Sequence, residues 1–389
     1  MQRHHFLEKI ARYFRTHTVV AILGPRQCGK TTLTKQYIRH IQDFSEENYF
    51  DLEDPIALQR LENPMLSLRA LFGLVVIDEI QRRPELFPIL RVLVDDHEQK
   101  QRFLILGSAS RDLLQQSSET LAGRIAYIEL TPFAFQETKN LPALWSRGGF
   151  PMSYLAKTEA DSFDWREFYI RTVHEQDFPN LGINIAPHAL RRFWTMLSHY
   201  HGNLFNAAEL GRSFGAADTT IRRYVDLLTS TFMIRQLQPW HANIKKRQVK
   251  APKVYMRDSG ILHSMLNLTT HADVLQHPKL GASWEGFALE EIIRAHQARS
   301  EDCYFWSTYS GAEVDLLLQK KGAFIAFECK FSDAPKLTKS MHSALQDLPI
   351  EHLFVVYPGK QDYPLSEKIT VKGLESYLLE VTKEITGTQ

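Results

Sequence analysis

The most constraining feature of the sequence is an apolar segment that runs directly into a loop bounded by two glycines. Residues 19–23 (VVAIL) predict a buried strand, and residues 24–31 (GPRQCGKT) fit the pattern G-x-x-x-x-G-K-[ST] of a phosphate-binding loop. In such a loop the glycines allow the turn that directs backbone N–H groups at a β-phosphate. Lys30 reaches the β- and γ-phosphates, and the Thr31 hydroxyl binds Mg²⁺. We expect a helix over residues 32–40 to begin at the loop, with its positive N-terminal dipole facing the phosphates.

This motif predicts nucleotide-contacting residues along the whole loop and at the start of the helix. They are Gly24, Pro25, Arg26, Gln27, Cys28, Gly29, Lys30, Thr31 and Thr32. Lys30 is also a predicted catalytic residue, because it neutralises charge on the γ-phosphate. The alternative is a glycine-rich turn that binds no nucleotide.

A second motif is an apolar run that ends in two acids. Residues 74–80 (LVVIDEI) predict a buried strand with Asp78 and Glu79 at its end. In P-loop ATPases the first acid holds Mg²⁺ through water and the second orients the attacking water. A buried strand with a polar end would also explain the run, but its position after the loop favours a nucleotide site. We therefore expect ATP and Mg²⁺ as ligands, with Thr31 and Asp78 at the metal and Glu79 catalytic.

Composition bounds the number of domains and the partners. The 389 residues, 44% of them hydrophobic, are enough for two to three domains. A net charge of +1 excludes a polyelectrolyte that binds nucleic acid with its whole surface, so any such contact must come from a local patch. The three cysteines are far apart and lack metal-ligand spacing, which predicts a reducing compartment. No apolar run approaches about 18 residues and the N-terminus has no signal-peptide pattern, so we expect a cytoplasmic protein without a membrane span.

The rest of the N-terminal part alternates strands with helices. Beyond the segments already named, we expect strands at residues 49–52 and 103–110, and helices at residues 1–18, at residues 54–63 and after Pro84. This alternation predicts a parallel sheet that is covered by helices on both faces.

Several of these stretches, together with one farther downstream, also resemble a known family. They are LGPRQCGKTTL, LVVIDEIQRRPELFPILRVLVD, FLILGSAS, LAGRIAYIELTPFAFQE and KRQVKAPKVYMRDSGIL. On these motifs the chain resembles a large family of bacterial and archaeal AAA-superfamily ATP-binding proteins that carry a C-terminal domain of unassigned function. The resemblance extends over nearly the whole chain and implies an ATPase of the P-loop class, while the biological role of the family is poorly fixed.

Two further residues gain an interpretation from the AAA-type pattern. Ser108 lies at the end of the strand expected at residues 103–110, where AAA-type ATPases place a residue that senses the γ-phosphate between the two catalytic strands. Arg124 follows on a turn and is predicted to act as an arginine finger on a γ-phosphate, in its own chain or in a neighbouring copy, and the second case implies a homo-oligomer. The alternatives are an ordinary turn serine and a surface arginine.

The middle of the chain predicts a linker, a helical connector and a winged helix. Residues 141–151 contain prolines and glycines that are typical of a linker, and residues 164–177 have a helical period. The polar residues 174–177 (HEQD) are interpreted as a solvated helix end, because no matching metal ligands follow them. From residue 190 the chain predicts helices, and the pair joined around Gly215 matches a helix-turn-helix followed by two wing strands, MIRQLQPWH and KVYMRD.

Two groups of residues in this winged-helix region are predicted to contact DNA or RNA. The recognition helix carries Thr219, Thr220, Arg222 and Arg223. The basic segment at residues 245–257 contributes Lys245, Lys246, Arg247, Lys250, Lys253 and Arg257. Contacts to about five phosphates would make binding steeply salt-dependent. The alternative is a packing or interface module with a solvated run of charges.

The C-terminal part predicts a nuclease-like constellation. A helix at residues 281–298, strands at 303–307, 312–319 and 323–329, a helix at 336–348 and a strand at 353–357 give the order αβββαβ. Glu285 lies early in the first helix and Asp315 inside the second strand. Glu328 and Lys330 form an E-x-K triplet. This order of elements, with the pattern E…D-x12-E-x-K, resembles the restriction-endonuclease-like core of the PD-(D/E)xK superfamily.

The spacing of these residues predicts a metal site. Asp315 and Glu328 on adjacent strands can point side by side and share Mg²⁺, and Glu285 would add a further carboxylate. Lys330 lies two residues after Glu328 and faces the same side of the strand, where it can orient a water and stabilise the developing charge on the phosphate. The alternatives are a plain salt bridge between Glu328 and Lys330 and a nuclease fold that no longer cleaves.

Together these observations predict an α/β protein in four parts. They are a P-loop AAA-type ATPase domain with a parallel sheet (1–140), a helical connector (141–198), a winged-helix domain (199–262) and a restriction-endonuclease-like α/β domain (263–389). The leading hypothesis is a Mg²⁺-dependent ATPase that couples ATP hydrolysis to the nuclease-like module on nucleic acid. The alternatives are an ATP-regulated, Mg²⁺-dependent nuclease and a non-enzymatic interaction scaffold that is switched by nucleotide.

Overall fold

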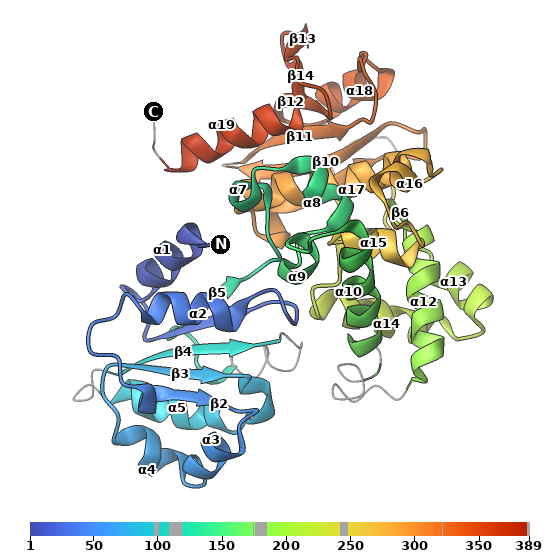
Figure 1. Cartoon of the computed structure of the whole chain (residues 1–389). Helices are drawn as coiled ribbons and strands as arrows, with labels where there is room; N and C mark the ends of the chain where they lie inside the picture. Colours follow the sequence, from blue (N-terminus) through green and yellow to red (C-terminus); the bar gives the residue numbers. More distant parts are fainter. Residues whose placement is uncertain are drawn as a thin grey trace. The chain divides into compact units, whose positions relative to one another are not determined.

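Two β-sheets, one in each of two structural units, organise the chain (Figure 1). The computed structural model describes residues 1–96, 101–108, 119–173, 175, 185–241, 248–320 and 322–386. Unit 1 consists of Met1–Pro132 and Asp226–Phe232, and unit 2 of Phe133–Val225 and Met233–Gln389. The polar cluster predicted at residues 174–177 lies outside the described residues, apart from Glu175. Among the described helices, none combines the length and the apolar content that crossing a bilayer requires.

Unit 1 is built on a five-stranded sheet in the order β2-β3-β4-β1-β5, in which neighbouring strands are parallel. Its strands are β1 (Val19–Leu23), β2 (Tyr49–Asp51), β3 (Leu74–Asp78), β4 (Arg102–Gly107) and β5 (Ile125–Glu129). Its helices are α1 (His4–Tyr13), α2 (Lys30–Ile38), α3 (Pro55–Arg60), α4 (Pro64–Arg69) and α5 (Leu86–Asp95), with short 3₁₀ turns η1 (Glu46–Asn48) and η2 (Ile80–Arg82). The predicted parallel sheet is confirmed. Because β4 lies between β1 and β3, the carboxyl ends of these three strands meet at one edge.

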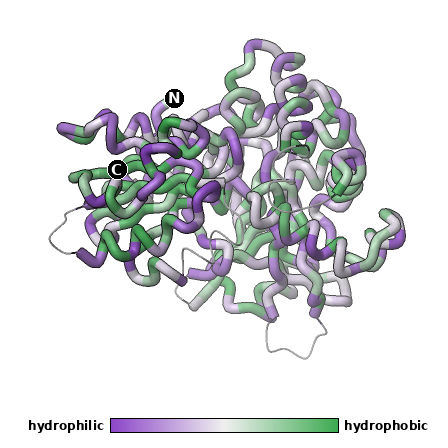
Figure 2. Tube along the Cα trace, turned by 90° about the horizontal axis from the view of Figure 1, so that it is seen from below, coloured by the Kyte–Doolittle hydropathy of each residue, from purple (hydrophilic) through white to green (hydrophobic). Residues whose placement is uncertain are grey.

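Both faces of this sheet are covered, as the alternating side chains of β1 demonstrate. Val20 and Ile22 belong to an apolar cluster with buried residues of α1 and α2. Val19 and Ala21 belong to a second cluster that includes the buried leucines of α5. Since successive side chains of a strand point to opposite faces, α1 and α2 cover one face and α5 covers the other. Figure 2 shows the hydrophobic segments concentrated in the interior and hydrophilic segments toward the surface.

Unit 2 contains a nine-stranded mixed sheet in the order β13-β14-β12-β11-β10-β9-β7-β8-β6. Its strands are β6 (Asn203–Leu204), β7 (Ile234–Pro239), β8 (Lys253–Met256), β9 (Cys303–Ser307), β10 (Glu313–Lys320), β11 (Ala323–Cys329), β12 (Ile350–Tyr357), β13 (Tyr363–Ser366) and β14 (Ile369–Gly373). Its helices are α7 (Phe135–Thr138), α8 (Leu141–Arg147), α9 (Pro151–Tyr154), α10 (Glu159–Thr172), α12 (Pro187–His199), α13 (Ala207–Phe214), α15 (Ser259–Met265), α16 (His271–Gln276), α17 (Leu280–Ala295), α18 (Lys339–Asp347) and α19 (Leu374–Thr386), with the 3₁₀ turn η4 (Ser300–Asp302). Helix α14 (Asp218–Ser230) begins in unit 2 and ends in the segment that belongs to unit 1.

This sheet joins the two regions for which the sequence predicts a winged helix and a nuclease-like domain. The predicted wing strands are β7 and β8, which pair antiparallel, and β7 also pairs parallel with β9. The sheet continues through the antiparallel pairs β9–β10 and β10–β11 to the parallel pair β11–β12. The boundary expected between residues 262 and 263 therefore falls within one structural unit. The order α17-β9-β10-β11-α18-β12 agrees with the expected αβββαβ pattern, and β13, β14 and α19 extend it.

The linker expected at residues 141–151 is wrong, because most of this stretch is a packed helix. The Asn140 side chain caps the N-terminus of α8, and Pro142 occupies its first turn. Trp145 is buried, and its Nε1 donates a hydrogen bond to Ser283 Oγ of α17 at 3.0 Å. A proline in the first turn of a helix loses no helical hydrogen bond, so here it begins a helix and does not mark a linker.

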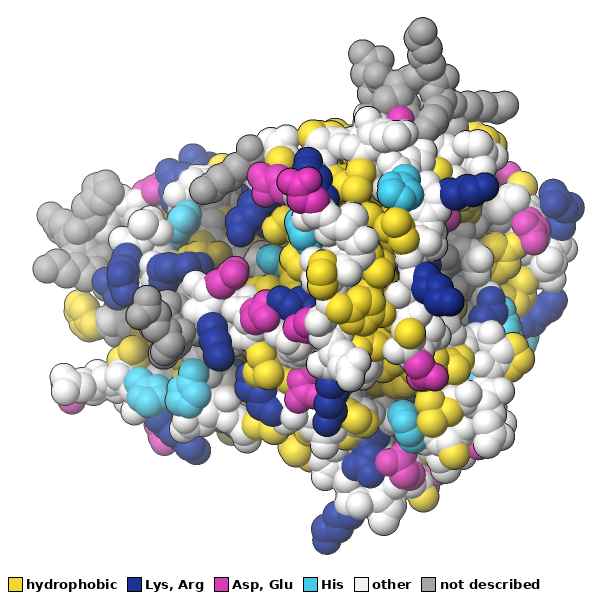
Figure 3. All heavy atoms as spheres, turned by 90° about the horizontal axis from the view of Figure 1, so that it is seen from above, with side chains coloured by type: hydrophobic (Ala, Val, Ile, Leu, Met, Phe, Trp, Pro, Cys, Tyr) yellow, Lys and Arg dark blue, Asp and Glu magenta, His cyan; other side chains and the backbone are white. Residues whose placement is uncertain are grey.

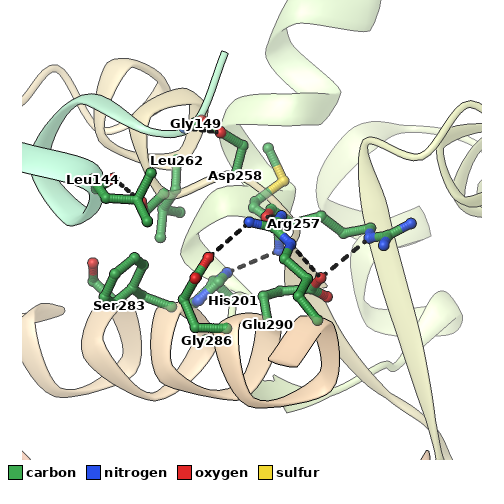
Figure 4. A pocket seen from close by; sticks show the side chains of 14 residues that line it. Leu144, Gly149, His201, Arg257, Asp258, Leu262, Ser283, Gly286 and Glu290 are labelled. Atoms are coloured by element: carbon green, nitrogen blue, oxygen red, sulfur yellow. Dashed lines mark hydrogen bonds and ion pairs between the residues drawn. The ribbon is translucent and has the colours of Figure 1, made fainter. Parts of the chain in front are cut away.

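A buried ion network joins α17 to β7 and to the residue that follows β8. The Glu290 carboxylate accepts hydrogen bonds from Arg235 and forms ion pairs with Arg257 and Arg294. Burial alone would raise the pKa of Glu290, but these three guanidinium groups lower it to about 2. Figure 4 shows Arg257 and Glu290 pointing toward one another. The cavity that they line has a volume of about 10 Å³, which has room for at most one water molecule. The network therefore stabilises the packing of unit 2 and does not form a ligand pocket.

We expect Glu290→Ala to lower the free energy of unfolding by about 3 to 5 kcal/mol, because it leaves buried arginines without their carboxylate. The folded pKa of about 2 lies below the ordinary value of 4.5, so this stabilisation is complete above pH 4.5 and is lost as the pH falls toward 2. Chemical and thermal unfolding followed by circular dichroism, near neutral pH and near pH 3, measures both effects. The control is Glu367→Ala, which removes an exposed glutamate. Equal stability of the two variants at neutral pH would contradict the prediction.

Candidate functional site

The predicted phosphate-binding loop closes around the Lys30 side chain. Lys30 is 5% exposed, and its Nζ donates hydrogen bonds to the carbonyl oxygens of Gly24 (3.1 Å) and Pro25 (3.0 Å). Two backbone oxygens of the loop thus hold the ammonium group that the motif assigns to the phosphates. Phosphate oxygens carry more negative charge than carbonyl oxygens, so a bound nucleotide would compete effectively for these hydrogen bonds.

Backbone geometry explains both glycines of the motif. Gly29 is the N-cap of α2 and has a φ of 99°, in the left-handed region that favours glycine. A Cβ on Gly24 would lie 2.2 Å from the carbonyl oxygen of Leu130, so the loop packs directly on the chain after β5. In the part of the chain that the structure describes, no side chain caps α2. Its first N–H groups and its positive dipole end therefore face the loop, as a phosphate site requires.

The two predicted magnesium ligands of unit 1 contact one another directly. The Thr31 hydroxyl donates to Asp78 Oδ2 at 2.8 Å, and the hydroxyl of Tyr49 donates to the same oxygen at 2.9 Å. Hydroxyl and carboxylate oxygens are suitable ligands for Mg²⁺, so this donor set fits the ion. Tyr49 is not predicted from the motif, although it lies on β2 beside β3. Burial and the Asp78 carboxylate raise the pKa of Tyr49, so its hydroxyl keeps the proton that it donates.

Glu79 follows in a conformation that is uncommon for a residue with a side chain. Its φ is 57°, and such left-handed residues often mark functional sites. Gln81 Nε2 donates to the Glu79 carboxylate and to Ser108 Oγ, the latter at 3.3 Å. Burial raises the pKa of Glu79, while the Lys30 ammonium and the Gln81 amide oppose this effect. Gln81, which the motif does not predict, thus joins the expected water-orienting acid to the expected sensor at the end of β4.

Arg3 ties the loop to the end of unit 1. Its guanidinium group is buried, and Nη1 donates to the carbonyl of Cys28 at 3.2 Å. Nη2 donates to the carbonyls of Thr131 (3.0 Å) and Pro132 (3.4 Å), the last two residues before the chain enters unit 2. Cys28 also donates through Sγ to the Leu130 carbonyl at 3.3 Å. No motif points to Arg3, because it precedes α1 and meets the loop only in the folded chain.

The remaining loop residues lie at its outer side. Arg26 pairs with Glu53 at 3.1 Å, and its side chain is 31% exposed. Gln27 is exposed and has a φ of 60°. Thr32 is exposed on the first turn of α2. Their predicted contacts with nucleotide stay predictions.

Arg124 lies at the opposite edge of the parallel sheet from the loop. It immediately precedes β5, and the first residue of β5, Ile125, pairs with the first residue of β1, Val19. Its guanidinium group forms hydrogen bonds with both carboxylate oxygens of Asp95. Since the loop follows the carboxyl end of β1, this placement does not support a finger that acts within the same chain. A finger directed at a neighbouring copy stays a prediction.

In unit 2 two of the three predicted acids, Glu285 and Asp315, lie against a lysine that was expected on the surface. Lys253 of β8 is 5% exposed. Its Nζ lies 3.3 Å from Glu285 Oε1 and 3.8 Å from Asp315 Oδ1, and it also pairs with the Glu313 carboxylate. Strand β8, helix α17, strands β10 and β11 and the residue that follows β11 supply this carboxylate cluster. We define it as Lys253, Tyr255, Glu285, Glu313, Asp315, Glu328 and Lys330.

The carboxylates of the cluster have further partners. Tyr255 donates its hydroxyl to Glu285 Oε1 at 2.6 Å. A backbone N–H of β11 donates to Asp315 Oδ2 at 2.9 Å, and Lys330 Nζ donates to Glu328 Oε2 at 3.2 Å. Tyr255 lies two residues after Lys253 and on the same face of β8. This K-x-Y alternation is the sequence pattern that could have predicted that both side chains join the cluster.

Burial and mutual repulsion separate the pKa values of these acids. Burial and the neighbouring Asp315 raise the pKa of Glu285 to about 7 and raise the pKa of Glu328 well above its usual range. Burial would also raise the pKa of Asp315, but Lys253 and Lys330 lower it. Burial and the nearby Asp315 therefore favour the protonated form of Glu328, whereas the two lysines favour the ionised form of Asp315.

This arrangement does not fit the predicted second Mg²⁺ site. Among the residues that the structure describes, no three His, Cys, Asp or Glu side chains are grouped so that they could hold a metal ion. Mg²⁺ requires oxygen ligands at about 2.0 to 2.1 Å in octahedral geometry, whereas the Lys253 ammonium occupies the space between Glu285 and Asp315. The metal role of Glu285, Asp315 and Glu328 and the catalytic role of Lys330 stay predictions that this geometry does not support.

Two of the six basic residues predicted to contact nucleic acid are internal. Lys253 belongs to the carboxylate cluster, and Arg257 pairs with Glu290 at 3.4 Å with 11% of its side chain exposed. Neither group is available to a phosphate, so this part of the prediction is wrong. Lys250 is exposed, whereas residues 245–247 lie outside the described part of the chain.

The predicted helix-turn-helix corresponds to α13 and α14. Gly215 ends α13 with a φ of 83°, which allows the chain to turn into α14. On α14, Thr219, Arg222 and Arg223 are exposed and Thr220 is half-buried.

Family comparisons divide the chain into three regions. Residues 16–139 match the family described as an AAA domain. Residues 138–272 match a domain of unknown function (DUF8612), and residues 280–377 match a second domain of unknown function (DUF4143). The AAA match includes the loop, β3 and β4. The resemblance expected from the motifs is therefore confirmed: the chain carries the AAA domain of AAA-superfamily ATP-binding proteins and a C-terminal domain of unknown function.

The uncharacterized protein Rv2008c of Mycobacterium tuberculosis is 46% identical over 371 residues, which are 95% of this chain and 83% of the relative. This chain belongs to the same family as Rv2008c. An uncharacterized protein of Haemophilus influenzae is 22% identical over 365 residues, which are 85% of this chain and 87% of that protein. Among solved structures, the Walker-type ATPase of Pyrococcus abyssi aligns with 68% of this chain and 95% of its own, at 13% identity and a TM-score of 0.43.

We expect Arg3→Met to weaken ATP binding by about tenfold, because three carbonyls lose their donor and the loop loses its connection to residues 131–132. The measurement is the dissociation constant of magnesium-ATP by calorimetry, with circular dichroism as the test of folding. Arg15→Met is the control, since Arg15 is an exposed arginine that follows the other end of α1. A folded Arg3→Met protein with unchanged affinity would show that the loop does not depend on this contact.

Proposed function

We propose that the chain hydrolyses ATP with Mg²⁺ at the edge of the parallel sheet where β1, β3 and β4 end. The observation that supports this proposal most directly is the 2.8 Å contact between Thr31 and Asp78, which joins the loop to the acidic strand. In the same region the Lys30 ammonium is buried in the loop and Glu79 lies next to Asp78. A nucleotide, a metal ion and an attacking water thus each have suitable protein groups.

Each group has one expected task. Lys30 would exchange two carbonyl partners for oxygens of the β- and γ-phosphates. Thr31 and Asp78 would hold Mg²⁺, which when bound supplies positive charge against the phosphates. Glu79 would orient the attacking water, and Gln81 would keep its carboxylate directed toward Ser108 at the γ-phosphate end. Glu79 must be ionised for this task, and the Lys30 ammonium favours its ionised form.

We further propose that the nucleotide state reaches unit 2 through Arg3. The supporting contacts run from the Cys28 carbonyl in the loop to Arg3 and from there to Thr131 and Pro132, where the chain leaves unit 1. When Lys30 releases the carbonyls of the loop to bind phosphate, the loop backbone and Cys28 must adjust. The adjustment would then move the residues that precede unit 2.

Glu79→Gln is expected to lower the turnover number for ATP by at least about 100-fold while it changes the dissociation constant for ATP only a few-fold, because it removes a base but no phosphate contact. Lys30→Ala is expected to abolish binding. Phosphate release and calorimetric titration with magnesium-ATP measure the two effects separately. Glu62→Gln, at an exposed glutamate of unit 1, is the matched control.

Two outcomes would count against this assignment. Unchanged turnover in Glu79→Gln would remove the water-orienting role of Glu79. Absence of heat on titration of magnesium-ATP into the unmodified protein would remove the nucleotide site itself.

The second candidate function is nucleic-acid contact by α13 and α14. The supporting observation is that Arg222 and Arg223 lie exposed and adjacent on the helix that follows the Gly215 turn. Figure 3 shows acidic and basic side chains interspersed over the face of the molecule that it presents, as expected from a net charge of +1. Binding would therefore depend on local groups such as this pair and Lys250, without the internal Lys253 and Arg257.

The Arg222→Ala/Arg223→Ala double variant is expected to weaken binding of duplex DNA by at least about tenfold and to reduce the slope of log affinity against log salt by about 2, because two phosphate contacts are lost. Fluorescence anisotropy at several salt concentrations, with and without ATP, provides both values. Arg39→Ala/Arg69→Ala removes two exposed arginines of unit 1 and is the control. Identical salt slopes for the two double variants would exclude α14 as the contact.

A further inference from the structure

We propose that Lys253 is a built-in cation of the carboxylate cluster and takes the place that a divalent metal ion would have there. The region that resembles a metal-dependent nuclease would then hold its acidic residues without Mg²⁺. This inference concerns unit 2 alone and goes beyond the proposed ATP hydrolysis.

The position of the ammonium group is the first argument. Lys253 Nζ has carboxylate oxygens from Glu285 on α17 and from Glu313 and Asp315 on β10 as its neighbours. Two of these acids, Glu285 and Asp315, belong to the predicted metal site, and the cation lies against both of them. An ammonium group buried to 5% exposure is stable only with such partners, so the lysine and the acids require one another.

The distances between the ammonium group and the carboxylate oxygens are the second argument. Ion-pair distances of 3.3 and 3.8 Å suit an ammonium group, whereas a Mg²⁺ ion would need the same oxygens to approach to about 2.1 Å. Other contacts also fix the acids in these positions. The Tyr255 hydroxyl holds Glu285, and a β11 backbone N–H holds Asp315. Lys253 further lies 5.6 Å from the centre of the Phe305 ring, which closes one side of the site.

The origin of the lysine is the third argument. Lys253 and Tyr255 come from β8, within the region that matches DUF8612, whereas Glu285, Glu313 and Asp315 come from the region that matches DUF4143. Charge attraction therefore joins the two regions, in addition to the shared sheet. While β8 is in place, the acids have their cation and a phosphodiester-cleaving metal has no site among them.

The first test compares metal binding by the unmodified full-length chain with binding by Asp315→Asn, in the absence of nucleotide. Mn²⁺ is the probe, and electron paramagnetic resonance counts the bound ions. The proposal expects the same number of bound Mn²⁺ ions in both proteins. One additional Mn²⁺ in the unmodified chain would overturn it, and Glu285→Gln repeats the comparison with a second acid.

The second test removes the lysine. Lys253→Met keeps the approximate length of the side chain and deletes the charge. The space of the ammonium group is then free, and the acids lack a positive partner. We expect this variant to bind about one more Mn²⁺ ion than the unmodified chain and to melt at a lower temperature that Mn²⁺ raises again. Lys250→Met, three residues earlier at an exposed position, is expected to change neither value.

The outcomes separate the possibilities. A folded Lys253→Met protein that gains no Mn²⁺ overturns the proposal, because the lysine then does not stand in for a metal. If this variant does not fold, the comparison of the unmodified chain with Asp315→Asn and Glu285→Gln decides. Neither test involves ATP, so failure of the proposed ATP hydrolysis would leave both results unaffected.

Discussion

Cations that are buried away from water must be surrounded by oxygen atoms, and this requirement organises both units of the chain. Two loop carbonyls hold Lys30, three carbonyls hold Arg3, and three carboxylates hold Lys253. In the ion network of unit 2, Glu290 accepts from Arg235. In most of these cases the oxygens come from elements that are far apart in the sequence. Because a buried charge without partners is very costly, each cation fixes the relative positions of the elements that surround it.

The nucleotide site depends on the same requirement. Its polar groups already have partners in the described structure: Lys30 has carbonyls, Thr31 has Asp78, and Glu79 has Gln81. Binding of a triphosphate and Mg²⁺ would therefore exchange hydrogen bonds, and few groups would need to move far. The strand order makes this possible, since β4 lies between β1 and β3 and their ends present the loop, the acids and Ser108 at one edge. The exchange also involves the loop carbonyls, and so the backbone that Arg3 connects to residues 131–132.

The sequence predicts most of what is local. The strands at residues 19–23, 303–307 and 323–329 have the expected bounds, because each is an apolar run with clear ends. The linker at 141–151 is wrong because a proline can begin a helix as well as interrupt one, and only the burial of α8 distinguishes the two. Partners such as Arg3 could not be predicted, because they meet the site through tertiary contacts. Lys253 was wrongly predicted to contact nucleic acid, because the five other basic residues of its segment indicated a run of charges at the surface.

The carboxylate cluster explains why a motif of acids and a lysine cannot by itself identify a metal site. Glu285 on α17 and Asp315 on β10 lie close enough to share a cation, and that placement is equally suited to any cation that fits between them. Whether the cation is Mg²⁺ or an ammonium group depends on a residue outside the motif, in this chain Lys253 on β8. An ammonium group that belongs to the chain does not have to be bound from solution and cannot dissociate from the acids. Unlike a metal ion, however, it supplies no Lewis acid and no activated water. The fold can therefore keep a nuclease-like arrangement of acids for the stability of the sheet and for its connection to the middle region, independently of phosphodiester cleavage.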